Sequence, residues 1–581
     1  MSQKELNLGI LAHVDAGKTT LTERLLYAAG IIDAIGSVDD GTTQTDSLAL
    51  EQQRGITIKS AVVSFAIDDV TVNLIDTPGH PDFIAEVERV LSVLDGAVLV
   101  ISAVEGVQAQ TRLLMRALQR LHVPTLIFVN KIDRPGASYE AVLHAISERL
   151  TPALIPVGSA RELGTRAANF TPWGATDAAF AARLASALAE RNDAILAAYV
   201  DDETSVSYSR LREELAAQSK QALVHPVFFG SAITGAGVDA LIAGIAELLP
   251  AAEGHADGPV SGTVFKVGRG VAGERIAWVR MFSGTLRTRE RPLFRGDHDG
   301  KVTAIRVFDH GHAVRRSSVV AGQIAQVWGL AEIQIGDAIG LPRTTADHGL
   351  FGPPTLETVV VPRSRGDKGA LHAALVQLAE QDPLINLRQD DDRQELFVSL
   401  YGEVQKEVIQ ETLANDFDIE VEFRETTPVC IERPIGPGAA VEKLGAASNP
   451  FLATVGLRIE PAPINTGVEF RLQVGVRSIP QYVYKTVENF GRALEETVRT
   501  TLQQGLYGWQ VTDCTVTMTD CGYSSPGSTA GDFRKLTPLV LMSALKEADT
   551  KVCEPIHHFH LEGPADSLLS LIHISEPTRP Y

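Results

Sequence analysis

The sequence predicts a multidomain protein: an α/β domain with a doubly wound parallel sheet, then a β-barrel domain, then two α+β domains. Three observations predict this architecture. The 581-residue chain is longer than one hydrophobic core supports. Residues 1–250 alternate strand-like and helix-like runs, whereas residues 259–345 form short alternating segments separated by glycines. Strand and helix patterns mix again over residues 355–428 and 429–553.

Composition and charge are those of an ordinary globular protein. Hydrophobic residues make up 44% and charged residues 21% of the chain. The formal net charge of −20, from 52 basic and 72 acidic residues, argues against a general polyanion binder but leaves room for a locally basic face that contacts RNA. The four cysteines lack CxxC spacing, so we expect reduced thiols rather than a metal site or disulfides.

No segment of the sequence predicts export or membrane insertion. Residues 2–5 are polar, and the apolar run over residues 6–12 is too short for a signal peptide. No run approaches the roughly 20 apolar residues of a membrane span. We therefore expect a soluble, cytoplasmic protein with no membrane partner.

The α/β prediction for residues 1–250 depends on five apolar runs of strand length and the helical patterns between them. The strands are predicted at Leu6–Ala12, Val70–Ile75, Ala97–Ser102, Thr125–Asn130 and Pro226–Gly230. The helices are predicted at Thr19–Ala29, Gln108–Leu121, Tyr139–Leu150 and Val238–Leu248. Such sheets bind ligands at the carboxyl ends of their strands.

The remaining domains follow from changes in periodicity. Short alternating segments at Arg275–Phe282, Lys301–Phe308 and Gln323–Val327 predict the barrel. The first α+β domain is predicted from strands at Thr355–Val361, Glu395–Leu400 and Ile419–Phe423, with helices at Gly369–Glu380 and Val404–Leu413. In the second we expect a long helix at Gln481–Gln504 and a loop between a strand at Thr515–Thr519 and a helix at Phe533–Ala548.

A phosphate-binding loop is predicted where the first strand meets the first helix. Backbone N–H groups of such a loop and the following helix N-terminus surround a β-phosphate, and Gly17 allows close approach. Lys18 would reach the β- and γ-phosphates, and the Thr19 hydroxyl would ligate Mg²⁺. The residues of this motif are Ala12, His13, Val14, Asp15, Ala16, Gly17, Lys18, Thr19 and Thr20.

A second motif follows the strand that ends near residue 76. Asp76 can hold Mg²⁺ through water, and the Gly79 amide can meet the γ-phosphate. The residues of this motif are Asp76, Thr77, Pro78, Gly79 and His80.

Two further motifs predict that the base is guanine. Asn130, Lys131, Ile132 and Asp133 end another strand. Asp133 can accept both the N1 and N2 protons of guanine, a pair that adenine does not offer. Ser231 and Ala232, after a fifth strand, fit a loop whose backbone recognises the guanine oxygen. Each motif alone could be a surface turn, but all four in this order at strand ends favour GTP.

Arg54–Ile58 (Arg-Gly-Ile-Thr-Ile) lies between the first helix and the next strand. Thr57 could supply a second hydroxyl to Mg²⁺ when the γ-phosphate orders this segment, which would make the segment an order–disorder switch. The alternative for an isolated segment of this kind is an ordinary amphipathic strand.

Together, the segments His-Val-Asp-Ala-Gly-Lys-Thr-Thr, Arg-Gly-Ile-Thr-Ile, Asp-Thr-Pro-Gly-His and Asn-Lys-Ile-Asp resemble those of the translational GTPases. The resemblance implies that His80 is catalytic and positions the attacking water, with Val14 and Ile56 as apolar neighbours. On chemistry alone His80 could instead be a helix-cap residue. Residues 321–337 also resemble the second-domain barrel of elongation factor G, and the branch implies ferredoxin-like and ribosomal-S5-like α+β domains.

Within that branch, residues 504–514 and 523–534 resemble the ribosomal protection proteins that confer tetracycline resistance. The resemblance implies a monomeric, ribosome-stimulated GTPase that releases tetracycline from the decoding region. Its tip would be the loop at 521–534, where Tyr523 could stack on an unpaired base. The tip residues are Tyr523, Ser524, Ser525, Pro526 and Gly527. Without the resemblance, a solvated surface turn is the simpler interpretation.

Two other functions and one departure from the family stay open. An elongation-factor-G-like translocation factor and a GTP-dependent switch that never hydrolyses share the same motifs. The family implies a fifth domain after residue 564, whereas residues 554–581 read as a remnant of it followed by a non-matching tail. The sequence alone therefore predicts a truncated fifth domain.

Overall fold

The computed structural model describes residues 4–36, 51, 57–193, 195–197, 206–251, 254–270, 272–295, 298–343, 350–390 and 395–556. The chain forms two compact units. The first comprises residues 1–354, 358–389 and 395–424, and the second comprises the rest. Arg54, Gly55 and Ile56 lie outside the described residues, as does most of the predicted 554–581 remnant.

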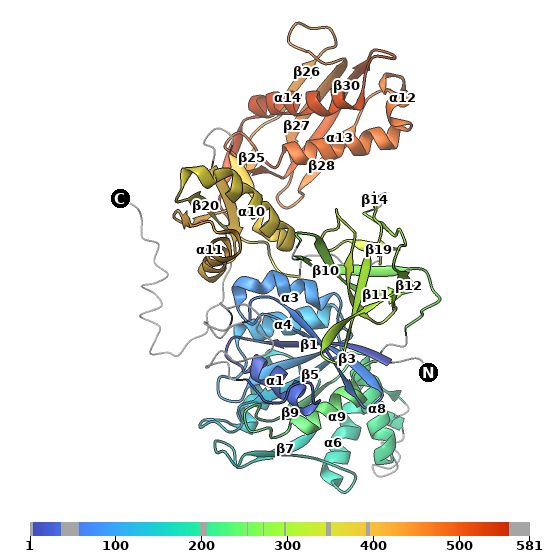
Figure 1. The fold of residues 1–581 in the computed structure, drawn as a ribbon, viewed down its shortest axis with the longest axis vertical. Helices are drawn as coiled ribbons and strands as arrows, with labels where there is room; N and C mark the ends of the chain where they lie inside the picture. The colour runs from blue at the N-terminus through green and yellow to red at the C-terminus, as the bar shows by residue number, and fades with distance from the viewer. Residues whose placement is uncertain are drawn as a thin grey trace. The chain divides into compact units, whose positions relative to one another are not determined.

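A seven-stranded sheet forms the centre of the amino-terminal domain in the first unit (Figure 1). Its order is β2-β3-β1-β4-β5-β9-β6, and the neighbouring pairs are parallel except β2–β3. The strands are β1 Lys4–Ala12, β2 Ala61–Ile67, β3 Val70–Asp76, β4 Gly96–Ser102, β5 Thr125–Asn130, β6 Leu154–Pro156 and β9 His225–Phe229. The parallel sheet was predicted, but the antiparallel edge strand β2 was not. A tight turn in which Asp68 adopts φ 51° joins β2 to β3.

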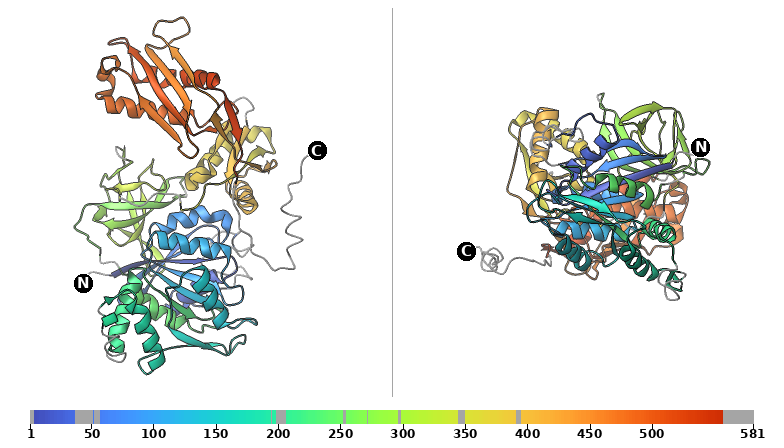
Figure 2. Two further views of the ribbon diagram at one scale, coloured as in Figure 1. Left: turned by 180° about the vertical axis from the view of Figure 1, so that it is seen from behind. Right: turned by 90° about the horizontal axis from the view of Figure 1, so that it is seen from below.

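Helices cover both faces of this sheet, with α4 on one face and α1 and α9 on the other (Figures 1 and 2). Their apolar sides and the buried strands form one continuous core. The helices are α1 Lys18–Ala28, α3 Ile84–Leu91, α4 Ala109–Arg120, α5 Tyr139–Arg149, α6 Ala178–Ala189, α8 Tyr208–Lys220 and α9 Val238–Leu248. A short 3-10 helix, η1 Pro81–Phe83, precedes α3, and a hairpin pairs β7 Gly158–Arg161 with β8 Asn169–Pro172.

The direction of the strands positions the site. Because β1, β3 and β5 run parallel, their carboxyl ends at Ala12, Asp76 and Asn130 meet at one edge of the sheet. The motifs that follow these residues are thereby brought together.

The second domain of the first unit is an antiparallel sheet that curls around its own core. The order is β14-β13-β19-β10-β11-β18-β15-β16, with a separate β12–β17 pair. One cluster of buried side chains draws on strands from across the sheet, as expected for a barrel-like domain. The strands are β10 Ser261–Arg269, β11 Arg275–Ser283, β12 Thr285–Arg287, β13 Leu293–Phe294, β14 His298–Asp299, β15 Ala304–Asp309, β16 His312–Arg316, β17 Ser318–Val320, β18 Ile324–Trp328 and β19 Ala338–Gly340.

The third domain is an α+β sandwich. Its sheet has the order β21-β22-β20-β23, with β24 also pairing β20. The elements are β20 Leu356–Pro362, η2 Arg365–Asp367, α10 Lys368–Gln381, η3 Pro383–Ile385, β21 Arg388–Asp390, β22 Glu395–Leu400, α11 Glu403–Phe417, β23 Val421–Phe423 and β24 Thr427–Pro428. Throughout the part of the chain that the structure describes, no helix has the length and apolar character needed to span a membrane.

The second unit contains a four-stranded sheet of order β26-β27-β30-β28, which shares a core with α13 and α14. A three-stranded sheet of order β29-β25-β31 lies in the same unit. The elements are β25 Ile431–Pro434, β26 Gly438–Glu442, β27 Ala453–Pro461, β28 Val468–Leu472, η4 Val476–Ser478, α12 Gln481–Tyr484, α13 Val487–Thr501, β29 Gln510–Val511, β30 Cys514–Tyr523, α14 Ala530–Ala548 and β31 Thr550–Cys553.

The prediction of one long helix over residues 481–504 is wrong. Lys485 adopts φ 66°, which ends α12 because a left-handed residue cannot continue a right-handed helix. Thr486 then starts α13 by accepting a hydrogen bond of 3.1 Å from the Asn489 amide.

The predicted limits of the tip loop are also wrong. Strand β30 runs on to Tyr523, because β27 pairs with it as far as Ala453 opposite Tyr523. Helix α14 begins at Ala530, where Thr529 and Asp532 form a capping box. The loop is therefore restricted to residues 524–529, and Tyr523 belongs to the strand.

Candidate functional site

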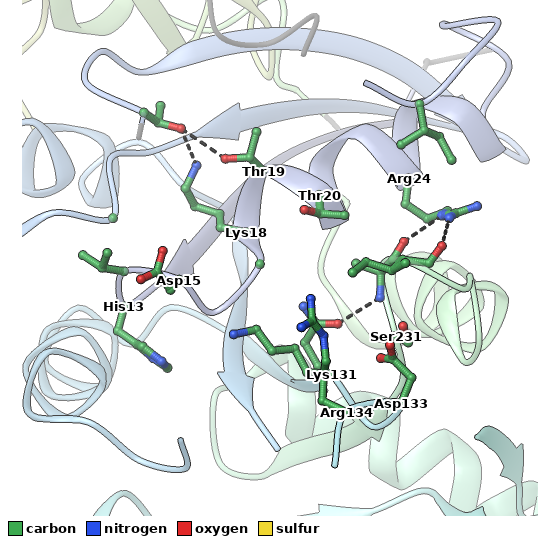
Figure 3. A pocket seen from close by; sticks show the side chains of 18 of the residues that line it. His13, Asp15, Lys18, Thr19, Thr20, Arg24, Lys131, Asp133, Arg134 and Ser231 are labelled. Carbon is green, nitrogen blue, oxygen red and sulfur yellow. Dashed lines mark hydrogen bonds between the residues drawn. The ribbon is translucent and has the colours of Figure 1, made fainter. Parts of the chain in front are cut away.

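The four amino-terminal motifs line one cavity of about 490 Å³ (Figure 3). This size suits a nucleotide-sized ligand. The predicted residues that line it are His13, Val14, Asp15, Gly17, Lys18, Thr19, Thr20, Thr57, Gly79, His80, Asn130, Lys131, Asp133, Ser231 and Ala232. The predicted residues that do not line it are Ala12, Ala16, Asp76, Thr77 and Pro78, all of which are buried. Thr77, for example, donates to the Ile10 carbonyl at 2.9 Å and ties its loop to β1.

Gly17 is required where the loop enters α1. Its φ of 87° lies in the left-handed region, and an added Cβ would come within 2.4 Å of Asn130 Nδ2. The absence of a side chain lets the loop lie against Asn130 and leaves the first N–H groups of α1 near the cavity. Such a helix start favours a phosphate group.

Oxygen ligands for a cation converge behind this loop. Lys18 Nζ lies 2.7 Å from Asp76 Oδ1 and 3.1 Å from Thr57 Oγ1. Thr19 Oγ1 lies 3.4 Å from Thr57 Oγ1, and all four side chains are buried. Two hydroxyls and a carboxylate are hard oxygen donors of the kind that Mg²⁺ prefers, so the residues present fit a magnesium ion with its phosphate ligands.

At the other end of the cavity, one Asp133 oxygen fits a guanine base. Asp133 Oδ1 is buried and has no hydrogen-bond partner among the described residues. A buried carboxylate oxygen of this kind requires a donor, and the guanine edge supplies two N–H groups. The Ala232 amide, expected near the guanine oxygen, donates to Asn130 Oδ1 at 2.9 Å.

His80 caps η1 from the edge of the cavity. Its Nδ1 accepts a hydrogen bond of 3.2 Å from the Asp82 amide, and it lies 3.4 Å from Asp82 Oδ1. The helix-cap interpretation is therefore correct for Nδ1. It does not conflict with a role at the nucleotide, because a capping Nδ1 leaves Nε2 as a separate polar atom.

His13 and Lys131 line the cavity but have protein partners. His13 Nδ1 lies 3.1 Å from Thr111 Oγ1, and burial lowers the pKa of the imidazole, which favours its neutral form. Lys131 Nζ pairs with Glu105 Oε1 at 3.1 Å. These contacts indicate that both side chains help to hold the walls of the cavity.

Arg24, which was not predicted from the sequence, holds the loop after β9. Its Nε donates to the Ala232 carbonyl at 2.9 Å, and its Nη2 donates to the Ile233 carbonyl (Figure 3). Arg24 follows Thr20 by one helical turn, and both line the cavity. The four-residue spacing between Thr20 and Arg24, on the helix that begins at Lys18, is the sequence feature from which this position could have been predicted.

In the second unit, four of the five predicted tip residues, Ser524–Gly527, lie in a short, internally bonded turn, and Tyr523 precedes them as the last residue of β30. Ser525, Pro526 and Gly527 are exposed, whereas Ser524 donates its amide to Ser528 Oγ at 2.8 Å. Tyr523 is partly buried against the domain core, and its ring lies 5.7 Å from that of Tyr482. Tyr482 was not predicted from the sequence; its hydroxyl lies 3.2 Å from the Ser524 carbonyl oxygen and 3.0 Å from that of Ser528.

Comparisons with known proteins identify three of the domains. The profile of the elongation factor Tu GTP binding domain matches residues 3–251. Those of elongation factor G domain III and domain IV match residues 351–425 and 430–549. A solved protein structure from Thermus thermophilus shares the fold with a TM-score of 0.65 and 23% identity, covering 95% of this chain and 86% of that one.

The relatives are named as resistance proteins. The oxytetracycline resistance protein of Streptomyces rimosus is 52% identical over 97% of this chain and 86% of its own length. Tetracycline resistance protein TetM of Streptomyces lividans is 45% identical over 98% and 88%. TetO of Campylobacter jejuni is 38% identical over 98% and 87%. The chain is a GTPase, and it belongs to the tetracycline-resistance ribosomal protection family of translational GTPases.

Proposed function

We propose that this chain is a ribosome-dependent GTPase that binds GTP with Mg²⁺ in the cavity, binds the ribosome and releases tetracycline from the decoding region. The observation that carries this proposal is the convergence of the four motifs in a chain 52% identical to an oxytetracycline resistance protein. The protein acts in the cytoplasm, where its ribosomal RNA and protein partners are, and works as a monomer.

The cavity supplies separate groups for each part of GTP. The N–H groups around Gly17 and the Lys18 ammonium bind the phosphates, while Asp133 accepts the guanine N–H groups. Thr19, Thr57 and, through water, Asp76 would hold Mg²⁺, which would supply positive charge beside the phosphates.

His80 positions the water that attacks the γ-phosphorus. A bond forms from the water oxygen to phosphorus and the bond to the β-phosphate oxygen breaks. GDP and phosphate leave, and the protons of the water pass to the phosphate and the solvent. His80 lines the cavity beside Gly79, and its Nδ1 contacts to Asp82 fix the imidazole at the edge of the site.

The deciding experiment measures labelled tetracycline released from ribosomes by the full chain with GTP, with GDP and with a non-hydrolysable GTP analogue. We expect release with GTP and none with GDP. His80→Ala should keep GTP affinity but slow ribosome-stimulated hydrolysis by roughly two orders of magnitude, because its contribution is made in the transition state. His144→Ala, at an exposed position of α5, is the matched control.

Three outcomes would contradict the proposal. Translocation activity without drug release would indicate an elongation factor. Drug release without any phosphate release would indicate a binding switch. An unchanged hydrolysis rate in His80→Ala would show that another group positions the water.

A further inference from the structure

The first turn of α11, in the third domain, is capped by a residue of the amino-terminal domain. The N-cap of α11 is Gly402, which has no side chain to accept from the first helical N–H groups. Asp82 supplies that acceptor: its Oδ2 accepts from the Val404 amide at 2.9 Å and from the Gln405 amide at 3.2 Å. A carboxylate in this position also interacts favourably with the helix dipole.

The same side chain contacts His80. Asp82 Oδ1 lies 3.4 Å from His80 Nδ1, and the Asp82 amide donates to that nitrogen at 3.2 Å. A neutral Nδ1 accepts from the amide, whereas a protonated Nδ1 donates to the carboxylate, so Asp82 provides a partner in either state. One residue therefore connects the histidine at the cavity to the start of α11.

Gly402 makes room for this arrangement. Its φ of −178° is ordinary extended backbone, so the local conformation does not require glycine. A Cβ at this position, however, would lie 2.4 Å from both carboxylate oxygens of Asp82. The missing side chain serves the contact between the two domains.

Apolar packing holds the same region together. Ile58 and Phe83 are buried in a small cluster with Val404 and Val408 of α11. Ile58 follows Thr57, and Phe83 follows Asp82, so both segments that border the phosphate end of the cavity contact the first turns of one helix.

We infer that Asp82 is a positioning residue through which docking of α11 orients His80 for hydrolysis. The inference rests on the proposed role of His80 in GTP hydrolysis. When α11 is docked, its two amides fix the Asp82 carboxylate, and Asp82 in turn fixes the imidazole. When α11 moves away, Asp82 loses both donors and His80 is no longer held in one orientation, so the third domain controls turnover without contacting the nucleotide.

The test uses three single variants of the full chain: Asp82→Ala, Asp82→Asn and Gly402→Ala. Asp82→Ala removes the cap and the histidine partner, whereas Gly402→Ala disturbs the same carboxylate from the third domain. Asp82→Ala and Gly402→Ala should each slow single-turnover hydrolysis on ribosomes by roughly ten- to a hundredfold without changing GTP affinity, since small misplacements of a catalytic group have effects of this size. Asp82→Asn, whose side-chain oxygen still caps the helix, should recover part of the rate.

A second readout is independent of turnover. Hydrogen exchange at the Val404 and Gln405 amides should accelerate in Asp82→Ala and Gly402→Ala, and melting curves establish that each variant is folded. In a His80→Ala background, Asp82→Ala should cause no further loss of rate, because the two residues act as one unit.

If Asp82→Ala and Gly402→Ala hydrolyse GTP at the parental rate while His80→Ala is slow, this inference is overturned and the proposed function is not. An Asp82→Ala effect that persists undiminished in the His80→Ala background would also overturn it. A parental rate for His80→Ala would overturn the proposed function and this inference with it. If Asp82→Ala does not fold, Gly402→Ala decides by the same criteria.

Discussion

Asn130 joins the phosphate end of the cavity to its guanine end. Its Nδ2 donates a hydrogen bond of 2.8 Å to the carbonyl of Ala16, and its Oδ1 accepts one of 2.9 Å from the Ala232 amide. One buried amide side chain thus holds the phosphate loop and the loop after β9 at a fixed separation.

Replacing Asn130 with alanine should weaken GTP binding and stability together. The change leaves the Ala16 carbonyl and the Ala232 amide without their buried partner, at about 1–3 kcal/mol for each group. Titration with a fluorescent GTP analogue and a thermal melt measure the two effects. Gln119→Ala, at an exposed position of α4, is the control. If the two variants have the same GTP affinity and the same melting temperature, Asn130 does not connect the loops.

Asp133→Asn should change which base the cavity prefers. The amide can no longer accept both guanine N–H groups, so GTP binding should weaken by roughly 2–5 kcal/mol. Xanthine carries an oxygen where guanine carries its amino group, so xanthosine triphosphate should bind the variant better than the parent. Competition between the two nucleotides measures the change in preference. An unchanged preference would show that Asp133 does not bind the base.

The predicted site residues at strand ends come together because parallel strands place their carboxyl ends at one edge. Ala12, Asp76 and Asn130 are examples, because each is the last residue of a strand. The predicted strands end at the same residues or, for Asp76, one residue earlier. Local patterns were sufficient for these, since a buried parallel strand reads as a continuous apolar run.

The features that were missed depend on contacts between distant residues. Asp82 caps a helix 322 positions away, and Tyr482 bonds to the tip loop 46 positions away. No periodicity or spacing reports such pairs. The end of β30 at Tyr523 was missed for the same reason, because pairing with β27 extends the strand beyond its apolar core.

His225 should make stability depend on pH. It is 3% exposed, its Nδ1 lies 3.3 Å from the Thr125 carbonyl, and burial lowers the pKa of the imidazole from its ordinary value of 6.5. The unfolded chain therefore binds a proton more readily than the folded chain. The stabilising contribution is complete above pH 6.5 and is lost as the pH falls through the lowered folded-state pKa.

His225→Gln tests this dependence, since its amide can still donate to the Thr125 carbonyl but does not titrate. Urea unfolding between about pH 5 and pH 8 should show a smaller loss of free energy on acidification in the variant than in the parent. His144→Gln, at an exposed position, is the control and should keep the parental slope. Parallel curves for parent and His225→Gln would show that His225 does not contribute.

Tyr482→Phe should loosen the tip loop without affecting the GTP site. The lost hydroxyl shares its one proton between the Ser524 and Ser528 carbonyls, a contribution of about 1 kcal/mol. The phenyl ring should keep its contact with Tyr523, so the fold of the domain should persist. Because residues 525–527 are exposed and the Tyr482 hydroxyl contacts the base of their loop, faster hydrogen exchange over 524–529 is expected, with less tetracycline released per ribosome. Tyr507→Phe is the matched control, because this tyrosine is 61% exposed in the same unit.

Unchanged release together with faster exchange would mean that tip stiffness does not drive drug release. Unchanged exchange would mean that the Tyr482 hydroxyl does not hold the loop, and that the contacts of Ser528 Oγ with the Ser524 amide and the Leu452 carbonyl are sufficient by themselves.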